Sequence, residues 1–385
     1  MLINEASTDR PEHELLVCCA RTEADATVSS RARVLLSEKI DWEYLFQLAR
    51  RHSVVPLVYT QLQTLAAELV PPEWMAQFKT SYQENVARNL VLTSELNALI
   101  RALNDAGIES IPFKGPVLAV LAYENLALRR FVDLDIIVKR DDVLLARDVL
   151  LNAGYECVLN VDQQTLLLQT QHNIQFKRDN GRTIVELHWE VASDLFARAV
   201  SADELWERLI QIDLNGETVN SMSVDDLMFS LCVHGSRHIW ERLSWVCDIA
   251  ELISRRKIDW PSLIDRARST DCERMFYLGL FLADRLFDIN VPLEIRSKLT
   301  TDTQLQKIAE VIIPRLFSGT THVPASPSQI FRFNFNLRTS WRGRARYFAF
   351  MLRPTDRDLG IHLPRPLSFA YYLIRPVRLL MFDKR

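Results

Sequence analysis

Apolar positions along the chain predict two helical stretches with a mixed stretch of strands and helices between them. From about residue 13 to residue 100, apolar residues recur every three or four positions, as in WEYLFQLARRHSVVPLVYTQLQTLAAEL. This spacing places them on one face of a helix. Asp105-Ala106-Gly107 then ends the last of these helices, because glycine readily adopts a left-handed cap. Helical spacing returns from about residue 201, and Ser223 with Asp226 predicts a helix start.

The central stretch alternates apolar and polar positions, which is typical of strands. A hairpin is predicted where NIQFKRDNGRTIVELHWEV carries the turn Asp179-Asn180-Gly181. In chain order the predicted elements are a strand in IESIPFKG, a short helix in PVLAVLAYEN, a strand in FVDLDIIVKR, a helix in DDVLLARDVLLNAGY and the hairpin. This order predicts an α+β fold: a small mixed sheet, with helices against one face, flanked by helical N- and C-terminal units.

The length of 385 residues gives room for two or three packing units. Hydrophobic residues make up 48% and charged residues 25%, which is the balance of an ordinary globular protein. The stretch 318–328, rich in Thr, Ser and Pro, is the best linker candidate. We therefore expect four parts, which are a helical N-terminal unit at 1–100, a core at 101–200, a helical unit at 201–325 and a basic-aromatic C-terminal arm at 326–385.

Missing motifs exclude several classes of protein. The chain has only 10 glycines, and neither G-x-G-x-x-G nor G-x-x-x-x-G-K-[ST] occurs, which argues against dinucleotide-binding and P-loop proteins. The six cysteines form no C-x-x-C, a pattern that suits reduced thiols in a cytosol. The N-terminus lacks the pattern of a signal peptide, and no run of about 18 apolar residues occurs. We expect a cytoplasmic protein without a membrane span.

Charge is unevenly spread along the chain. The net charge is −3, yet Phe331–Arg385 holds 12 Lys or Arg and only 3 Asp or Glu. The arginines of this arm alternate with aromatic and aliphatic residues. This composition predicts contact with a polyanion such as RNA, or with a membrane surface. The alternative is that the apolar face of the arm packs onto the body and leaves its arginines in water.

Acidic residues on the predicted strands are the first candidates for chemistry. Alternate side chains of a strand point to one face, so Asp133 and Asp135 project together, about 7 Å apart along the backbone. Glu186 stands among apolar residues in TIVELHWEV, and His188 shares its face. Hard divalent cations prefer oxygen ligands, and three close carboxylates persist together mainly when a cation neutralises them. These acids therefore predict a metal site. A bare D-x-D is a weak motif, and its alternative is two exposed aspartates on a half-solvated strand.

Basic residues lie just before the acidic strand. Lys114-Gly115 falls at a strand-to-helix turn, where a glycine lets a phosphate approach the backbone and the helix N-terminus favours an anion. Arg129 and Arg130 come directly before the strand. Lys114, Gly115, Arg129 and Arg130 are thus candidates for binding the phosphates of a nucleotide.

Histidines give a weaker signal. His188 either orients the site or acts in catalysis. His234 and His238 share a helix face, but Gly-Ser-Arg separates them, so H-E-x-x-H is absent and packing near the site is favoured over a zinc site. Arg237, Trp240 and Arg242 are candidate substrate contacts, although Trp and Leu at helical spacing are more often core.

The segments FKGPVLAVLAYENLALRRFVDLDIIVK, NAGY, VELHWEV and HGSRHIWERLSWVCDIAELI resemble an uncharacterised bacterial nucleotidyltransferase family of the DNA-polymerase-beta-like superfamily. The resemblance covers most of residues 40–255. It implies that Asp133 and Asp135 are the metal-binding pair and that Glu186 is the third acid, with Mg²⁺ or Mn²⁺ as the cofactor. Lys114 and Gly115 occupy the place of a Gly-Ser pair that holds nucleotide phosphates in better-known relatives.

The implied function is transfer of a nucleoside monophosphate from an NTP to an unidentified hydroxyl acceptor, which is a small molecule, a protein or an RNA. Two alternatives remain open. One is a module of the same fold that binds nucleotides or partners without catalysis. The other is a metal-dependent glycosyltransferase, because D-x-D also holds the metal of nucleotide-sugars, although the strand-helix region that would bind such a donor is missing.

Overall fold

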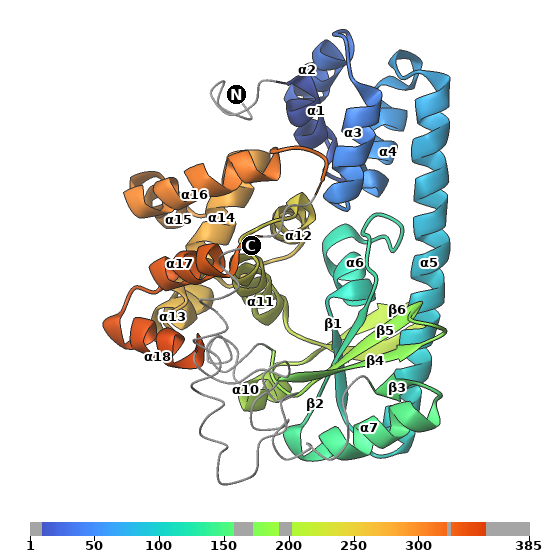
Figure 1. The fold of residues 1–385 in the computed structure, drawn as a ribbon, viewed down its shortest axis with the longest axis vertical. Coiled ribbons are helices and arrows are strands. Elements are labelled where there is room, and N and C mark those ends of the chain that lie inside the picture. Colours follow the sequence, from blue (N-terminus) through green and yellow to red (C-terminus); the bar gives the residue numbers. More distant parts are fainter. Residues whose placement is uncertain (1–9, 158–171, 192–201, 322–324, 352–385) are drawn as a thin grey trace.

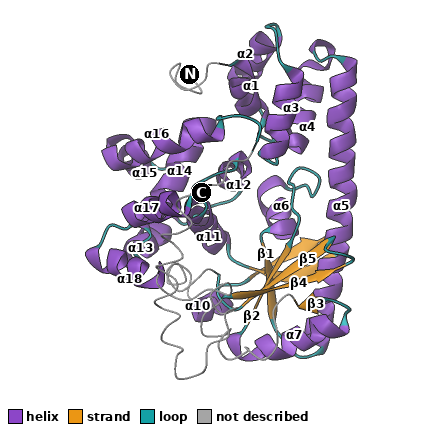
Figure 2. Cartoon of the chain, viewed as in Figure 1, coloured by secondary structure: helices purple, strands orange, loops and turns teal. Residues whose placement is uncertain are grey.

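A computed structural model of the protein describes residues 10–157, 172–191, 202–321 and 325–351 (Figure 1). Helices form most of it, and the strands gather in one small sheet and one hairpin at one end of the molecule (Figure 2). The predicted α+β class, with helical units on both sides of a mixed sheet in the chain, is confirmed. No helix of these residues is long and apolar enough to cross a bilayer.

The N-terminal part is helical, as predicted. Two of its helices begin at aspartates whose side chains accept a backbone N–H: Asp25 from Val28 at 2.8 Å and Asp41 from Tyr44 at 3.0 Å. The helices are α1 (Pro11–Cys19), α2 (Ala26–Leu36), α3 (Trp42–Arg51), α4 (Val55–Ala66), the short 3-10 helix η1 (Ala67–Leu69) and α5 (Pro72–Asp105).

Helix α5 spans 34 residues and connects the N-terminal helices to the sheet. It packs against α4 along its first part and reaches the first strand at its end (Figure 1). Gly107 follows with a φ of 75°, so the predicted left-handed cap is confirmed.

The sheet has five strands in the order β1-β2-β5-β4-β3. Strands β2 and β5 run parallel, whereas the other neighbours are antiparallel, so the sheet is mixed as predicted. The predicted hairpin is confirmed, and its turn residues Asp179, Asn180 and Gly181 all have positive φ. The strands are β1 (Ser110–Phe113), β2 (Leu134–Val138), β3 (Glu156–Cys157), β4 (Asn173–Arg178) and β5 (Thr183–His188).

Helices of the described chain contact the strands and bury their apolar side chains. They are α5, α6 (Gly115–Tyr123) and α7 (Val143–Asn152), the last preceded by the 3-10 turn η2 (Arg140–Asp142). The residues of β2 that alternate with Asp135, namely Leu134 and Ile136, are fully buried. The carboxylate of Asp135 is therefore held by a strand whose other face is fixed in the core.

The prediction of uninterrupted helix after residue 201 is wrong for residues 210–221. A short helix α10 (Ala202–Glu207) leads into an antiparallel hairpin of β6 (Ile210–Leu214) and β7 (Glu217–Ser221). Its turn is Asn215-Gly216, both with positive φ, which is the strongest short-range signal of a hairpin. β7 contacts β1, so the hairpin extends the sheet region.

The helical segment that begins at Ser223 is divided in two. The Ser223 side chain accepts the N–H of Asp226 at 3.1 Å, which confirms the predicted start. α11 (Val224–Arg237) then stops, Ile239 and Trp240 take positive φ, and α12 (Leu243–Arg255) begins. The Trp240 ring packs so closely on Gly235 that a Cβ there would lie 2.5 Å from it. Trp240 is thus a core residue and not a substrate contact.

The remaining described chain is helical. Its helices are α13 (Trp260–Ser269), α14 (Glu273–Phe287), α15 (Leu293–Thr301), α16 (Thr303–Leu316), α17 (Pro327–Leu337) and α18 (Trp341–Met351). The linker candidate 318–328 falls between α16 and the first residues of α17, with residues 322–324 outside the described chain. Most of the basic arm, residues 352–385, also lies outside it, so its predicted partners stay predictions.

Candidate active site

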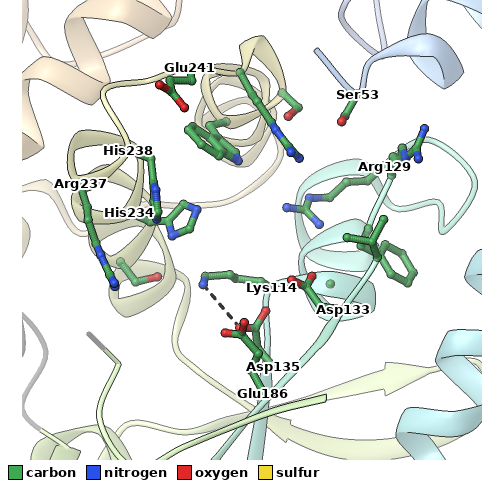
Figure 3. A pocket seen from close by; sticks show the side chains of 18 of the residues that line it. Ser53, Lys114, Arg129, Asp133, Asp135, Glu186, His234, Arg237, His238 and Glu241 are labelled. Atoms are coloured by element: carbon green, nitrogen blue, oxygen red, sulfur yellow. Dashed lines mark ion pairs between the residues drawn. The ribbon is translucent and has the colours of Figure 1, made fainter. Parts of the chain in front are cut away.

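A cavity of about 880 Å³ opens between the sheet, α11, the start of α12 and the N-terminal helices (Figure 3). Its wall contains all the acids, phosphate-binding residues and histidines predicted from the sequence, but not Trp240. The predicted residues in the wall are Lys114, Gly115, Arg129, Arg130, Asp133, Asp135, Glu186, His188, His234, Arg237, His238 and Arg242. Its volume lies toward the upper end of the range for ligand pockets, which is roughly 300–1,000 Å³.

Two carboxylates are placed side by side by the pairing of parallel strands. Asp135 on β2 lies directly opposite Glu186 on β5, so both side chains project from the same face of the sheet. Asp135 is 5% exposed, whereas Glu186 is partly open to the cavity. The amide of Asn173 on β4 donates to Glu186 Oε2 at 3.0 Å and fixes its orientation.

The imidazole of His188 lies between these two acids. Its Nε2 is 3.0 Å from Asp135 Oδ1 and 3.4 Å from Glu186 Oε2. Because carboxylates only accept, Nε2 carries the proton and donates. Burial opposes a charged imidazole, but the hydrogen bonds that His188 donates to both carboxylates prevail and raise its pKa. Hydrogen bonding to His188 in turn lowers the pKa of Glu186.

Asp133 and Asp135 differ in their electrostatic surroundings. Burial and then the charges of Asp135 and Glu186 raise the pKa of Asp133 to about 6. Burial would also raise the pKa of Asp135, but Lys114 and His188 together hold it below its usual value. Lys114 Nζ lies 3.6 Å from Asp135 Oδ1. Positive groups of the chain therefore stabilise the ionised form of Asp135. They do not offset the burial and repulsion that disfavour the ionised form of Asp133.

Lys114 adopts a backbone conformation that favours glycine. Its φ is 54° and its ψ is −142°, and Gly115 follows with a φ of 37° as the first residue of α6. Such strain costs on the order of 1–3 kcal/mol and is found mostly at functional sites. Here it turns the Lys114 amino group toward Asp135 while the N-terminus of α6 faces the cavity (Figure 3).

The donor set suits a divalent cation. One ligand atom each from Asp135, Glu186 and His188 lie within 4.8 Å of one another. Carboxylate oxygens are the ligands of Mg²⁺, and an added imidazole is compatible with Mn²⁺. Asp133 stands outside this compact group, although its pKa responds to both Asp135 and Glu186. The metal-binding role of Asp133 stays a prediction.

Arg129 is engaged by a buried acid from α12. Its Nε and Nη2 donate to the two carboxylate oxygens of Asp248 at 2.8 and 3.0 Å, and Tyr123 donates to the same carboxylate at 2.8 Å. Asp248 is fully buried. Arg129 is predicted from the sequence to bind phosphate, but in the structure its bidentate pair with Asp248 connects the loop before β2 to α12. The pair therefore holds that loop in place.

Two asparagines of α5 hold the same loop. Asn89 Nδ2 donates to the carbonyls of Leu126 and Arg129 at 2.5 and 2.8 Å, and Asn85 Nδ2 donates to that of Ala127 at 2.9 Å. Both asparagines are buried. The approach to Asp133 is thus fixed from two sides, by α5 and by α12.

The cavity also contains residues that the sequence analysis missed. Gln47, Arg50, Arg51 and Ser53 reach it from α3 and the turn after it, and Trp245 from α12. Another such residue is His172, whose Nε2 lies 3.4 Å from Arg237 Nη1. Burial, and then the charge of Arg237, lower the pKa of His172 to about 3. No local pattern marks these residues, because only the packing of distant helices brings them to the sheet.

His234 and His238 form an aromatic cluster with Trp245. The His234 ring centroid is 4.8 Å from that of His238 and 5.2 Å from that of Trp245. Burial, with Lys114 as a further cause, lowers the pKa of His234 well below its usual value. The neutral rings pack against each other, as the sequence analysis favoured, and form a wall of the cavity.

A family model described as uncharacterised nucleotidyltransferase matches residues 38–288, which is more than half of the chain. The chain belongs to this family. In the crystal structure of an antigenic nucleotidyltransferase-like protein from Paracoccidioides brasiliensis, 92% of that chain aligns with 54% of this one, at 15% identity and a TM-score of 0.37. Among curated proteins, none matches the chain significantly.

Arg129 and its neighbour Arg130 differ in their predicted effect on stability. Asp248→Ala leaves the buried Arg129 guanidinium without its partner, and loss of one member of a buried pair costs roughly 3–5 kcal/mol. We expect Asp248→Ala and Arg129→Ala to lower the free energy of unfolding by this order in urea denaturation. Arg130→Ala, at an exposed position without an ion pair in the described chain, is the matched control and should change it by less than about 0.5 kcal/mol.

The opposite pKa shifts of the two aspartates predict opposite effects of their amides. Because the pKa of Asp133 is raised from 3.8 to about 6, its ionisation opposes folding, and stability falls as pH rises from about 4 to about 6. Asp133→Asn should therefore stabilise the metal-free protein by roughly 1–3 kcal/mol at pH 7.5, with no gain near pH 4. Asp135→Asn should destabilise it at pH 7.5, because the pKa of Asp135 is lowered. Urea denaturation at both pH values tests this, and destabilisation by Asp133→Asn at pH 7.5 would contradict it.

Proposed function

We propose that the protein transfers a nucleoside monophosphate from an NTP to a hydroxyl acceptor in a reaction that depends on Mg²⁺ or Mn²⁺. The observation that carries the proposal is the pairing of Asp135 with Glu186 across parallel strands, with His188 Nε2 between them, at the floor of a large basic cavity. Family membership supports nucleotidyl transfer in general. We also propose a core like that of DNA polymerase beta, and a bacterial cytoplasmic protein.

Asp135 and Glu186, with Asp133 beside them, hold the cation. A bound divalent ion supplies Lewis-acid activation of the α-phosphate and neutralises part of the triphosphate charge. Lys114 and the backbone N–H of Gly115 bind the phosphates at the N-terminus of α6, where the helix dipole favours an anion. Asn173 keeps Glu186 oriented toward the cavity.

The proposed reaction forms one bond and breaks one. The acceptor oxygen attacks the α-phosphorus, and the bond from that phosphorus to the oxygen that bridges to the β-phosphate breaks. Glu186 takes the proton of the acceptor hydroxyl as a general base. Pyrophosphate leaves with its negative charge balanced by Lys114.

A module that binds nucleotides without turnover is the second candidate. It is favoured by Lys114, which stands where better-known relatives have a glycine of a Gly-Ser pair. The backbone of Lys114 adopts a conformation that favours glycine, and its amino group lies close to Asp135. Backbone strain of this kind is found mostly at functional sites, so it favours an active enzyme instead. Release of pyrophosphate from NTP distinguishes the two.

Removal of the two aspartates tests the location of the nucleotide. Isothermal titration of ATP, GTP, CTP and UTP with Mg²⁺ should show binding to the wild type and at least a tenfold loss in Asp133→Ala/Asp135→Ala. Asp141→Ala, an exposed acid at the far end of the same segment, is the control and should bind like the wild type. Equal binding by the double variant would place the nucleotide elsewhere.

A further inference from the structure

Four arginines from four separate elements act on one another electrostatically, and three of them line the cavity. They are Arg50 of α3, Arg88 of α5, Arg130 of the loop before β2, and Arg242 of the turn before α12. Arg50, Arg130 and Arg242 line the cavity itself. Partial burial, and then the positive charges of Arg88, Arg50 and Arg242, lower the pKa of Arg130. We call these four residues the arginine cluster.

No ion pair with a carboxylate forms at the arginine cluster within the described chain, whereas Arg129 beside it is held by Asp248. Glu84 acts against the lowered pKa of Arg130, but burial and the three other arginines outweigh it. Two of the guanidinium groups also lie near aromatic rings: Arg50 lies 5.9 Å from the centroid of Phe46 and Arg242 5.9 Å from that of Trp245. Guanidinium groups without a carboxylate partner are suited to an oxyanion, and to phosphate above all.

The carboxylates occupy one end of the cavity. In Figure 3, Ser53 and Glu241 stand at the opposite end from Asp135 and Glu186, and Arg50 and Arg242 lie within three residues of them along the chain. Lys114 lies at the carboxylate end, 3.6 Å from Asp135. The triphosphate of the donor thus has a cation at its own end, and the arginines are left for a second anionic group. The cavity volume of about 880 Å³ leaves space for two substrates.

We propose that Arg50, Arg130 and Arg242 bind a phosphate group of the acceptor, so that the substrate that receives the nucleotidyl group is itself phosphorylated. This inference rests on the proposed function, and it moves Arg130 from the nucleotide to the acceptor. Guanidinium groups from three elements surround the phosphate and position the acceptor hydroxyl toward the carboxylate end. Arg88 adds positive charge from α5.

The test uses inorganic phosphate as the probe and the full chain as the protein. Isothermal titration is carried out with and without saturating Mg²⁺ and a non-hydrolysable NTP analogue, so that binding at the donor position is blocked in one arm. We expect Arg130→Gln/Arg242→Gln to weaken phosphate binding at least tenfold in both arms, with binding of the NTP analogue changed by less than about threefold. Arg182→Gln, an exposed arginine in the β4-β5 turn, is the matched control and should bind phosphate like the wild type.

Contrary results separate the two proposals. Equal phosphate binding by wild type and the double variant, or no binding by wild type, overturns the acceptor site and leaves nucleotidyl transfer untouched. Loss of NTP binding in the double variant also overturns it, because the arginines would then hold the donor. Arginine-dependent phosphate binding without any Mg²⁺-dependent NTP binding would contradict the proposed function, and with it an acceptor role for the site.

The source of the phosphate is distinguished by competition. Ribose 5-phosphate and a short single-stranded RNA are each titrated against bound inorganic phosphate, in wild type and in the double variant. Arginine-dependent displacement by the sugar phosphate supports a small phosphorylated acceptor. Arginine-dependent displacement by RNA, with affinity that falls steeply with salt, supports a nucleic acid acceptor. Displacement that is the same in both proteins counts against the site.

Discussion

Repulsion among Asp133, Asp135 and Glu186 is the constraint on which the site depends. Three carboxylates that face one cavity are stable together only if positive charge lies among them. In the metal-free protein, Lys114 supplies it to Asp135 and His188 donates a hydrogen bond to Asp135 through Nε2, whereas Asp133 is left with a raised pKa. A divalent cation would complete the neutralisation. The metal-free site is therefore arranged to gain from binding one.

The rest of the fold holds these charges in position against their repulsion. The parallel pairing of β2 and β5 sets Asp135 opposite Glu186, and the buried side chains that alternate with them fix both strands. The loop that leads to Asp133 is held by two asparagines of α5 and by the Arg129–Asp248 pair. Helix α5 and the Arg129–Asp248 pair thus position the site, although neither supplies one of its three carboxylates.

Local pattern accounts for what the sequence alone could predict. Alternation predicts Asp133 and Asp135 on one strand, but the structure places Asp135 in β2 and Asp133 one residue before it. The Asp179-Asn180-Gly181 turn predicts the hairpin that carries Glu186. Asn215-Gly216 marks the β6-β7 hairpin, but its two five-residue strands lie between segments with helical spacing and are hard to separate from them by pattern alone. Other contacts depend on how distant helices pack, which no sequence spacing encodes. Arg129 pairs with Asp248, which is 119 residues away, and the charge of Arg50 acts on Arg130.

The most direct test of the account is the position of a metal ion in the site. Crystals grown with Mn²⁺ and a non-hydrolysable NTP analogue would be measured near the manganese absorption edge. We expect an anomalous peak within about 2.5 Å of carboxylate oxygens from both Asp135 and Glu186. We also expect that the hydrogen bond from His188 Nε2 to Asp135 is lost or replaced by coordination. A nucleotide bound in the cavity without such a peak, and with His188 still donating to Asp135, would contradict the account.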